Sequence, residues 1–209
     1  MFADRAEAGQ RLAAALIEYA DASAPPIVLG IPRGGVIVAR QVADALHAPL
    51  DVILTHKLGA PGNPELAIGA VAEDGTLLLD ELLLHQLWLP RGYLDQEIER
   101  QRAEMQRRAE VYRRGRARVD VSDRTVIVID DGVATGSTLI AALRSVRRQG
   151  AAKIVAAVPV GPRETARRLR LEADDVVMLE APFDFMAVGQ FYHHFEQVTD
   201  DEVRAALAQ

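Results

Sequence analysis

The chain has 209 residues, 49% of them hydrophobic and 26% charged, which is the composition of a globular protein of one large domain. It contains no cysteine, and this excludes a catalytic thiol, a cysteine-ligated zinc site and any disulfide. The formal net charge of −6 argues against a protein that binds nucleic acid over its whole surface. The longest uncharged stretch, 132–143, is shorter than the roughly 20 apolar residues of a membrane-spanning helix. Charged residues also occupy the start of the chain, so we expect no signal peptide and a cytoplasmic protein without membrane association.

The first part of the chain alternates between amphipathic and continuously apolar segments. In chain order these predict a helix over 4–19, a buried strand over 27–29, a helix over 36–46 and a second buried strand over 50–55. Residues 58–65 contain two glycines and two prolines, so we expect a loop there. The segments 67–72 and 76–79, separated by an acidic turn with a glycine, predict a β-hairpin.

The second part begins with a long charged helix, predicted over 94–114. A strand over 126–129, a helix over 139–148, a strand over 153–158, a helix over 164–171 and a strand over 176–179 follow. This alternation predicts an α/β fold with a doubly wound, mostly parallel five-stranded sheet flanked by helices. Ligands bind such sheets beyond the carboxyl ends of the strands, where the strand order reverses. Function should therefore be sought in the two glycine-rich turns that follow strands, at residues 30–35 and 132–138.

The turn at 132–138 offers backbone amides, three hydroxyls and two glycines at the start of a predicted helix. Free amides and the positive end of the helix dipole favour a phosphate there. Asp130 and Asp131 directly precede the turn and would repel that phosphate, so they must serve another purpose. A carboxylate pair can accept hydrogen bonds from sugar hydroxyls or hold Mg²⁺ through water. Alternatively, the two aspartates belong to a surface turn and Ser137 or Thr138 merely caps the helix.

The sequence VIVIDDGVATGST, residues 126–138, resembles the 5-phosphoribosyl-1-diphosphate (PRPP) signature of the type I phosphoribosyltransferases. The resemblance implies an enzyme of nucleotide metabolism that moves ribose 5-phosphate from PRPP to a nitrogen nucleophile, releasing pyrophosphate with Mg²⁺ present. It implies that Asp130 and Asp131 bind the ribose hydroxyls, act in catalysis and hold the metal through water. The 5-phosphate would be bound by Gly132, Val133, Ala134, Thr135, Gly136, Ser137 and Thr138.

The resemblance also implies a division of the chain. The sheet core would comprise residues 25–80 and 120–180, a helical insertion residues 80–118, and a small hood the tail at 181–209, all within one domain. Family members carry a pyrophosphate-binding loop after the first core strand, and Pro32, Arg33, Gly34 and Gly35 match it. That loop often holds a cis peptide before its basic residue, which would be Pro32–Arg33 here. The two glycines could instead serve only to start a helix packed tightly on its strand.

Lys57 follows the second predicted strand, where relatives place a basic residue near the pyrophosphate; the alternative is a solvated lysine. Beside it, the 58–65 loop occupies the place of a flexible loop that closes over the substrates in this family. Asn63 and Glu65 are therefore further candidates for the site.

The acceptor would be read by the tail, in which Phe183, Phe185, Phe191 and Tyr192 are concentrated. These rings resemble the aromatic stretch that stacks on the base in 6-oxopurine enzymes; alternatively, they form a cluster that packs the C-terminal helix onto the sheet. Hypoxanthine–guanine enzymes carry an acid inside the phosphate loop, and Ala134 stands at that position. The resemblance therefore disfavours hypoxanthine and guanine and leaves another base or an amine as acceptor.

Residues 100–118 hold eight arginines and two glutamates, a local charge of +6 in a chain of net charge −6. This stripe could be a solvated helix face, a contact between two subunits of a homodimer, or a surface for nucleic acid. The third possibility supports a rival function, a non-catalytic regulator that senses PRPP and binds RNA or a protein partner through this helix. We expect the enzyme, with small-molecule substrates and no nucleic acid.

Overall fold

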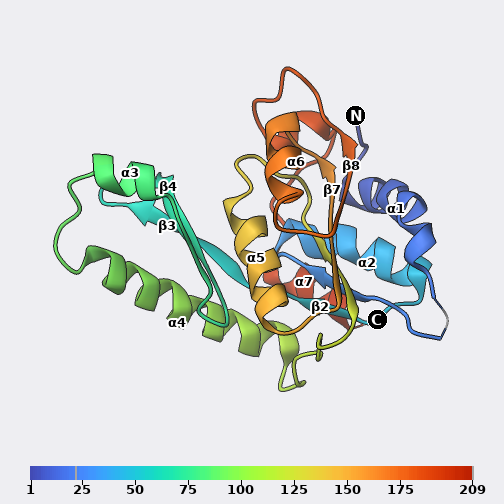
Figure 1. The fold of residues 1–209 in the computed structure, drawn as a ribbon. Coiled ribbons are helices and arrows are strands. Elements are labelled where there is room, and N and C mark those ends of the chain that lie inside the picture. The colour runs from blue at the N-terminus through green and yellow to red at the C-terminus, as the bar shows by residue number, and fades with distance from the viewer. Residues whose placement is uncertain (22, 209) are drawn as a thin grey trace.

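The computed structural model describes residues 1–21 and 23–208. Within them a sheet of five parallel strands has the order β2-β1-β6-β7-β8, which confirms the predicted fold (Figure 1). Its strands are β1 (Ile27–Gly30), β2 (Leu50–Val52), β6 (Thr125–Ile129), β7 (Lys153–Val160) and β8 (Asp175–Glu180). The chain leaves β1 toward β2 on one side and returns to β6 on the other, so the order reverses at β1.

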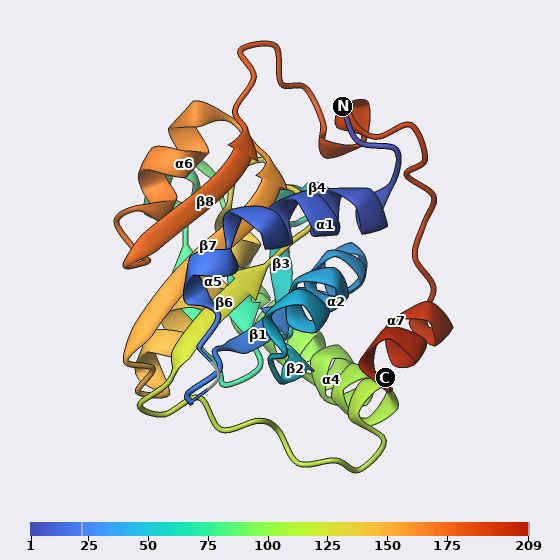
Figure 2. The same cartoon turned by 90° about the vertical axis from the view of Figure 1, so that its right-hand side faces the viewer.

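Helices cover both faces of this sheet (Figure 2). Helices α1 (Arg5–Ala15) and α2 (Gly34–Leu46) pack on one face, and α5 (Ser137–Arg148) and α6 (Arg163–Leu169) on the other. The strands supply both hydrophobic layers because successive side chains of a strand point to opposite faces. Val126 and Val128 of β6 face α5, while Ile127 and Ile129 face α1 and α2, and all four are fully buried.

A second sheet is antiparallel and contains β3 (Thr55–Ala60), β4 (Asn63–Ala72) and β5 (Leu77–Leu79). The prediction of a hairpin at 67–79 is confirmed, but the prediction of a loop over 58–65 is wrong. The prolines and glycines there shape a hairpin instead: Gly62 makes the turn with a φ of 73°, and a Cβ on Gly59 would lie 2.9 Å from the Cα of Pro64. The predicted core range of 25–80 needs the corresponding correction, because residues 55–79 lie outside the parallel sheet.

The predicted helical insertion consists of α3 (Glu81–Gln86) and α4 (Tyr93–Arg113). Together with the antiparallel sheet it forms an arm, residues 55–113, that extends from the body of the molecule (Figure 1). Helix α4 packs along β3 and against the C-terminal helix α7 (Asp200–Leu207). No helix in the described part of the chain has both the length and the apolar character needed to cross a membrane.

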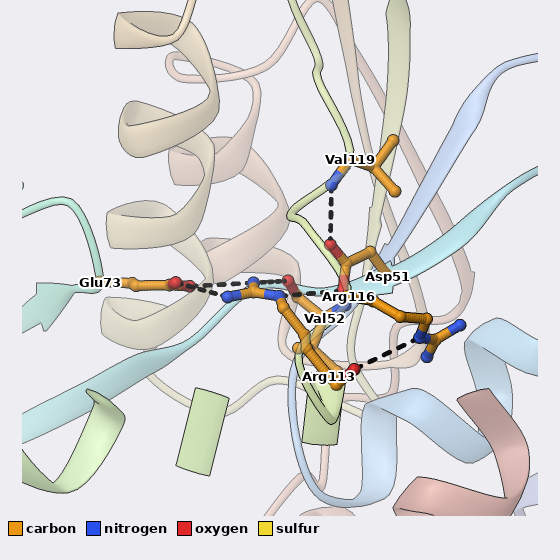
Figure 3. Close-up of polar contacts among 6 residues, drawn as sticks. All are labelled: Asp51, Val52, Glu73, Arg113, Arg116 and Val119. Atoms are coloured by element: carbon orange, nitrogen blue, oxygen red, sulfur yellow. Dashed lines mark hydrogen bonds and ion pairs between the residues drawn. The ribbon is translucent and has the colours of Figure 1, made fainter. Parts of the chain in front are cut away.

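Arg113, at the end of α4, anchors the arm to the parallel sheet (Figure 3). Its guanidinium donates to Asp51 at 3.2 Å and to the carbonyl of Val52 at 3.1 Å, both in β2, and to Glu73 of the arm at 2.6 Å. Asp51 also accepts a hydrogen bond from the amide of Val119. Arg113 and Asp51 are both buried, and this ion pair joins the arm, the sheet and, through Asp51, the segment that leads to β6.

The tail at 181–209 does not form a separate hood, which corrects the predicted division. Its first part pairs with the N-terminus through hydrogen bonds between Phe2 and residues 191 and 193. A cluster of rings closes around these bonds and contains Phe2, Phe185, Phe191, Tyr192 and Phe195. Helix α7 then packs on α2 and α4. The rings therefore form a packing cluster, but it holds the N-terminal segment and not the C-terminal helix that the alternative named.

Candidate functional site

Two glycine-rich loops meet at the point where the strand order reverses. Strands β1 and β6 are neighbours, with Gly30 paired to Ile129, and each is followed directly by its loop. We call residues 31–35 the first loop and residues 130–138 the second loop. The sequence predicted this meeting, since both loops leave the carboxyl ends of adjacent parallel strands. The Pro32–Arg33 peptide bond is cis, as the resemblance implied.

The glycines of the first loop allow the two loops to touch. A Cβ on Gly34 would lie 1.8 Å from the Oδ2 atom of Asp131, and a Cβ on Gly35 would lie 2.8 Å from the Cα of Asp130. Neither distance is possible for real atoms, so any larger residue would push the loops apart. The two glycines thus allow a tight approach, as the packing alternative held. What they approach is the aspartate pair: Gly34 lies against the carboxylate of Asp131 and Gly35 against the backbone of Asp130.

Asp131 is held from two other parts of the chain, through its carboxylate by Arg5 and through its backbone carbonyl by Tyr192. Arg5 of α1 donates from Nε to Oδ2 of Asp131 at 2.7 Å, and the two side chains are only 12% and 15% exposed. Tyr192 donates its hydroxyl to the carbonyl oxygen of Asp131 at 2.5 Å. Sequence reasoning missed Arg5 because nothing in the first helix marks it, and its partner lies 126 positions away.

Burial and proximity perturb both acids. Burial raises the pKa of Asp130 well above its ordinary value, and the neighbouring charge of Asp131 raises it further. Burial also raises the pKa of Asp131, although the guanidinium of Arg5 opposes this rise. Two adjacent carboxylates in such a place stay ionised together only with cationic or hydrogen-bond-donating groups around them. The site is therefore arranged to receive donors, such as hydroxyls, or positive charge.

Hydrogen bonds to neighbouring segments fix the second loop, and its last residues form the start of helix α5. The amide of Val133 donates to the carbonyl of Val160 at 2.9 Å, and Thr165 donates to the carbonyl of Ala134 at 2.5 Å. Arg168 donates to the carbonyl of Thr135 at 2.8 Å. Gly136, with a φ of 84°, precedes the first turn of α5, whose amides lack intrahelical partners. The loop has the geometry of an anion-binding helix start.

Two adjoining cavities flank the carboxylates. The larger, of about 910 Å³, is lined by Asp130 and residues 132–138 of the second loop, by Lys57 of the arm and by Arg168. The smaller, of about 460 Å³, is lined by Asp131, Arg5 and residues 31–34 of the first loop. Asp130 and Thr138 line both cavities. The structure thus brings the predicted residues of both loops and Lys57 to one site.

The predicted aromatic residues lie elsewhere. Phe185 stacks on Phe191 with 5.6 Å between ring centroids, and Tyr192 packs on Phe2 and Phe195. Phe183 is exposed beside Arg163. In the part of the chain that the structure describes, none of the four predicted rings lines either cavity. The further candidates Asn63 and Glu65 belong to the turn region of the arm, and the Glu65 side chain lies outside the described residues.

The larger cavity is bounded by the second loop, by Val188 of the tail and by the arm. The sequence connected Lys57 and residues 58–65 of the arm with the site, but not the rest of the arm. Besides Lys57, β4, β5 and α3 contribute apolar side chains, namely Leu66, Ala67, Leu78, Leu79, Leu82 and Leu83. A leucine-rich segment gives no sequence signal for a binding wall, because leucine is equally expected in a protein core.

Comparison with known proteins gives a consistent result. The sequence profile of the phosphoribosyl transferase domain matches residues 3–196. A Mycobacterium tuberculosis protein (strain H37Rv), provisionally named a phosphoribosyl transferase, is 46% identical over 207 residues, which are 99% of this chain and 46% of that protein. This chain thus spans less than half the length of that relative.

Solved structures also match. The protein TT1426 from Thermus thermophilus is 47% identical, with a TM-score of 0.82 over 99% of this chain and 97% of that one. A hypothetical protein from Neisseria gonorrhoeae, solved with bound ppGpp, is 12% identical and shares the fold, with a TM-score of 0.51 over 98% of this chain and 91% of that one.

Proposed function

The chain belongs to the phosphoribosyl transferase family, and on that premise we propose that it transfers ribose 5-phosphate from PRPP to a nitrogen of a base or an amine. One observation carries the proposal. The first loop and the second loop meet at the switch point, with the carboxylates of Asp130 and Asp131 at two adjoining cavities. A phosphate, a diol and a pyrophosphate are the three parts of PRPP, and each has a chemically matched group at this place.

Each part of the site has one task in this proposal. The amides at the start of α5, with the hydroxyls of Ser137 and Thr138, bind the 5-phosphate. Asp130 and Asp131 accept hydrogen bonds from the two ribose hydroxyls. Arg33 of the first loop lines the smaller cavity, is half-buried, and can grip the pyrophosphate with two parallel hydrogen bonds. Lys57 adds a cation from the arm.

The reaction replaces one bond at C1 of the ribose. The bond from C1 to the pyrophosphate oxygen breaks, and its electron pair leaves with the pyrophosphate. The acceptor nitrogen forms the new bond to C1 and loses a proton. Positive charge develops on the sugar during this exchange, and the half-buried carboxylates beside the ribose stabilise it electrostatically.

Mg²⁺ forms part of the proposal. Among the described residues, no group of three or more histidine, aspartate or glutamate side chains could hold a metal on its own. Asp131 is already paired with Arg5, and Oδ1 of Asp130 accepts from the amide of Asp131 at 2.9 Å. This donor set fits Mg²⁺ held through water and substrate oxygens, which that ion prefers to an all-protein cage. When bound, the ion supplies positive charge opposite the pyrophosphate.

The acceptor would occupy the larger cavity between the second loop and the leucines of the arm. The leucines of that wall would contact an apolar face of the acceptor, beside Asp80 and Glu81, which line the same cavity. The exposed methyl of Ala134 lines the same cavity and cannot exchange a proton with a purine, so we propose an acceptor other than hypoxanthine or guanine. The four predicted rings, Phe183, Phe185, Phe191 and Tyr192, line neither cavity and give no support to stacking of a base on them.

The rival function, an RNA-binding regulator, finds little support on α4. Of the eight arginines of the stripe, Arg100, Arg102, Arg107 and Arg108 form ion pairs with glutamates of the same helix and Arg113 is buried, whereas the other three follow the end of α4. A positively charged stripe that recognises phosphates needs unneutralised cations.

A screen for pyrophosphate release tests the proposed reaction. The protein is incubated with PRPP and Mg²⁺ against a panel of bases and amines, and we expect release with at least one acceptor that is neither hypoxanthine nor guanine. Asp131→Asn should reduce the rate at least about tenfold, since the amide cannot replace the charge beside the ribose. Asp184→Asn, which changes an exposed carboxylate of the tail, is the matched control. Equal rates for both variants would remove the carboxylates from their role.

A further inference from the structure

Arg5 is the residue of the site whose surroundings are most completely built. Its Nε atom donates to Asp131 at 2.7 Å, and its Nη1 atom donates to the carbonyl of Glu196 at 2.9 Å. The flat guanidinium lies over the ring of Phe195, 3.8 Å from the ring centroid. The guanidinium thus makes three contacts, one with the second loop and two with the tail. A solvated surface arginine is not held in this way.

The position of Arg5 also limits where Asp131 can point. A Cβ on Gly34 would lie 2.7 Å from Nε of Arg5 as well as 1.8 Å from Oδ2 of Asp131, so the ion pair rests against the bare backbone of the first loop. Tyr192 holds the backbone of Asp131 from the other side. One oxygen of the carboxylate is therefore committed to Arg5, which orients the whole group.

We infer that Arg5 is a positioning residue that fixes the Asp131 carboxylate for the ribose hydroxyls. Because the tail holds Arg5, this orientation also depends on the packing of the tail against the N-terminal helix. The inference rests on the proposed function, since it concerns the sugar of PRPP. Arg5 acts on the ligand through Asp131. The affinity for ribose 5-phosphate should therefore depend on Arg5, whereas the affinity for pyrophosphate, which Arg33 and Lys57 bind, should not.

The helix provides a matched control. Arg11, also in α1, pairs with Glu180 at 3.2 Å and lies 4.4 Å from the centroid of the Phe2 ring. Arg11→Gln therefore removes the same charge, an ion pair and a ring contact from the same helix without touching Asp131. A loss of affinity in Arg5→Gln but not in Arg11→Gln reports on the position of Arg5 and not on the total charge or the packing of α1.

Calorimetric titration with three probes, PRPP, ribose 5-phosphate and pyrophosphate, each with Mg²⁺, tests the inference. Arg5→Gln should weaken PRPP and ribose 5-phosphate about tenfold, the effect of losing a buried charged hydrogen bond, and leave pyrophosphate unchanged. Arg5→Lys, which keeps the charge and one donor, should recover part of the loss. In an Asp131→Asn background, Arg5→Gln should have little further effect, because the two residues act as a unit.

The outcomes separate this inference from the proposed function. If the unaltered protein binds no PRPP, the proposed function fails. If it binds PRPP and Arg5→Gln binds all three probes equally well, only the role of Arg5 is overturned. Equal weakening of all three probes would also overturn it, because Arg5 would then contact the pyrophosphate or maintain the fold as a whole. Should Arg5→Gln fail to fold, the comparison is made with Arg5→Lys, for which a selective loss on ribose 5-phosphate supports the inference and equal effects on all probes overturn it.

Discussion

Gly34 lies where the two loops of the site touch, and a single methyl group there would alter the site directly. Because the added Cβ would come 1.8 Å from Oδ2 of Asp131, Gly34→Ala must displace the carboxylate or the first loop. We predict that PRPP binding weakens about tenfold or more, since small displacements of positioning groups are costly. Calorimetry measures the affinity. Gly92→Ala is the control: its Cβ has no atom within 4 Å, although Gly92, unlike Gly34, has a left-handed φ of 78°. Equal binding by both variants would contradict the proposed contact.

Arg113 permits a second prediction, on stability. Arg113→Met would leave Asp51 and Glu73 without their cation, and Asp51 is only 5% exposed. Removing one partner of a buried ion pair typically costs about 3–5 kcal/mol of unfolding free energy. Arg107→Met, which breaks an exposed pair with Glu104, should cost less than about 1 kcal/mol. Urea denaturation measures both, and similar costs would show that Arg113 does not anchor the arm.

Individual site residues differed in how far the sequence could reveal them. The second loop, Arg33 and its glycines lie in continuous motifs directly after strands, so their positions followed from local pattern and topology. Arg5 and Tyr192 reach Asp131 from opposite ends of the chain, and only the packed structure brings them there. The rings of the tail were ambiguous because a buried cluster and a stacking platform require the same residues.

At the scale of elements, helix α4 shows how local ion pairs contribute. Glu104 pairs with Arg107 and Arg108 at the spacings that face each other on a helix. Hydrogen bonds from Arg107 and then Arg108 lower the pKa of Glu104 from 4.5 to about 2. A lowered folded-state pKa means that the pairs stabilise the protein above the unfolded value and that this contribution is lost as the pH falls from about 4.5 toward 2.

The prediction for this helix is a pH-dependent difference. Glu104→Gln should lower the unfolding free energy by less than about 1 kcal/mol at pH 7, because the pairs are partly solvated. The difference from the unaltered protein should shrink below pH 4.5, where the unfolded carboxyl group takes up a proton. Chemical denaturation at several pH values gives the measurement, with Glu110→Gln, another exposed carboxylate of α4, as the control. A difference that stays constant down to about pH 3 would contradict the assignment.

The strands and helices of the parallel sheet were predictable because each is a continuous apolar or amphipathic run. The β3–β4 hairpin was not, since its turn and its bulged pairing use the glycines and prolines that ordinarily mark a loop. Pro64 lies at the start of β4, before the residues that pair with β5, where a missing amide is tolerated. Local composition cannot distinguish a flexible loop from a hairpin of this kind.

At the scale of the whole molecule, the proposed function requires an acidic chain to bind a polyanion. The net charge of −6 does not oppose this, because the proposed binding depends on helix amides, Arg33, Lys57 and a metal ion placed around the carboxyl ends of β1 and β6. The sequence predicted the parallel sheet and the location of the site at its switch point. It connected Lys57 and residues 58–65 with the site, but it did not predict the leucine-rich wall that β4, β5 and α3 contribute to the larger cavity, because that depends on how distant elements pack.

The central claim is that the site at the carboxyl ends of β1 and β6 binds PRPP. Calorimetric titration of the unaltered protein with PRPP tests this most directly. We predict saturable binding to one site per chain at micromolar to millimolar ligand, stronger with Mg²⁺ than with a chelator, because the ion neutralises charge on the pyrophosphate. Asp131→Asn should weaken this binding at least about tenfold and leave the circular dichroism spectrum unchanged. No heat of binding at millimolar PRPP with Mg²⁺ present would contradict the account.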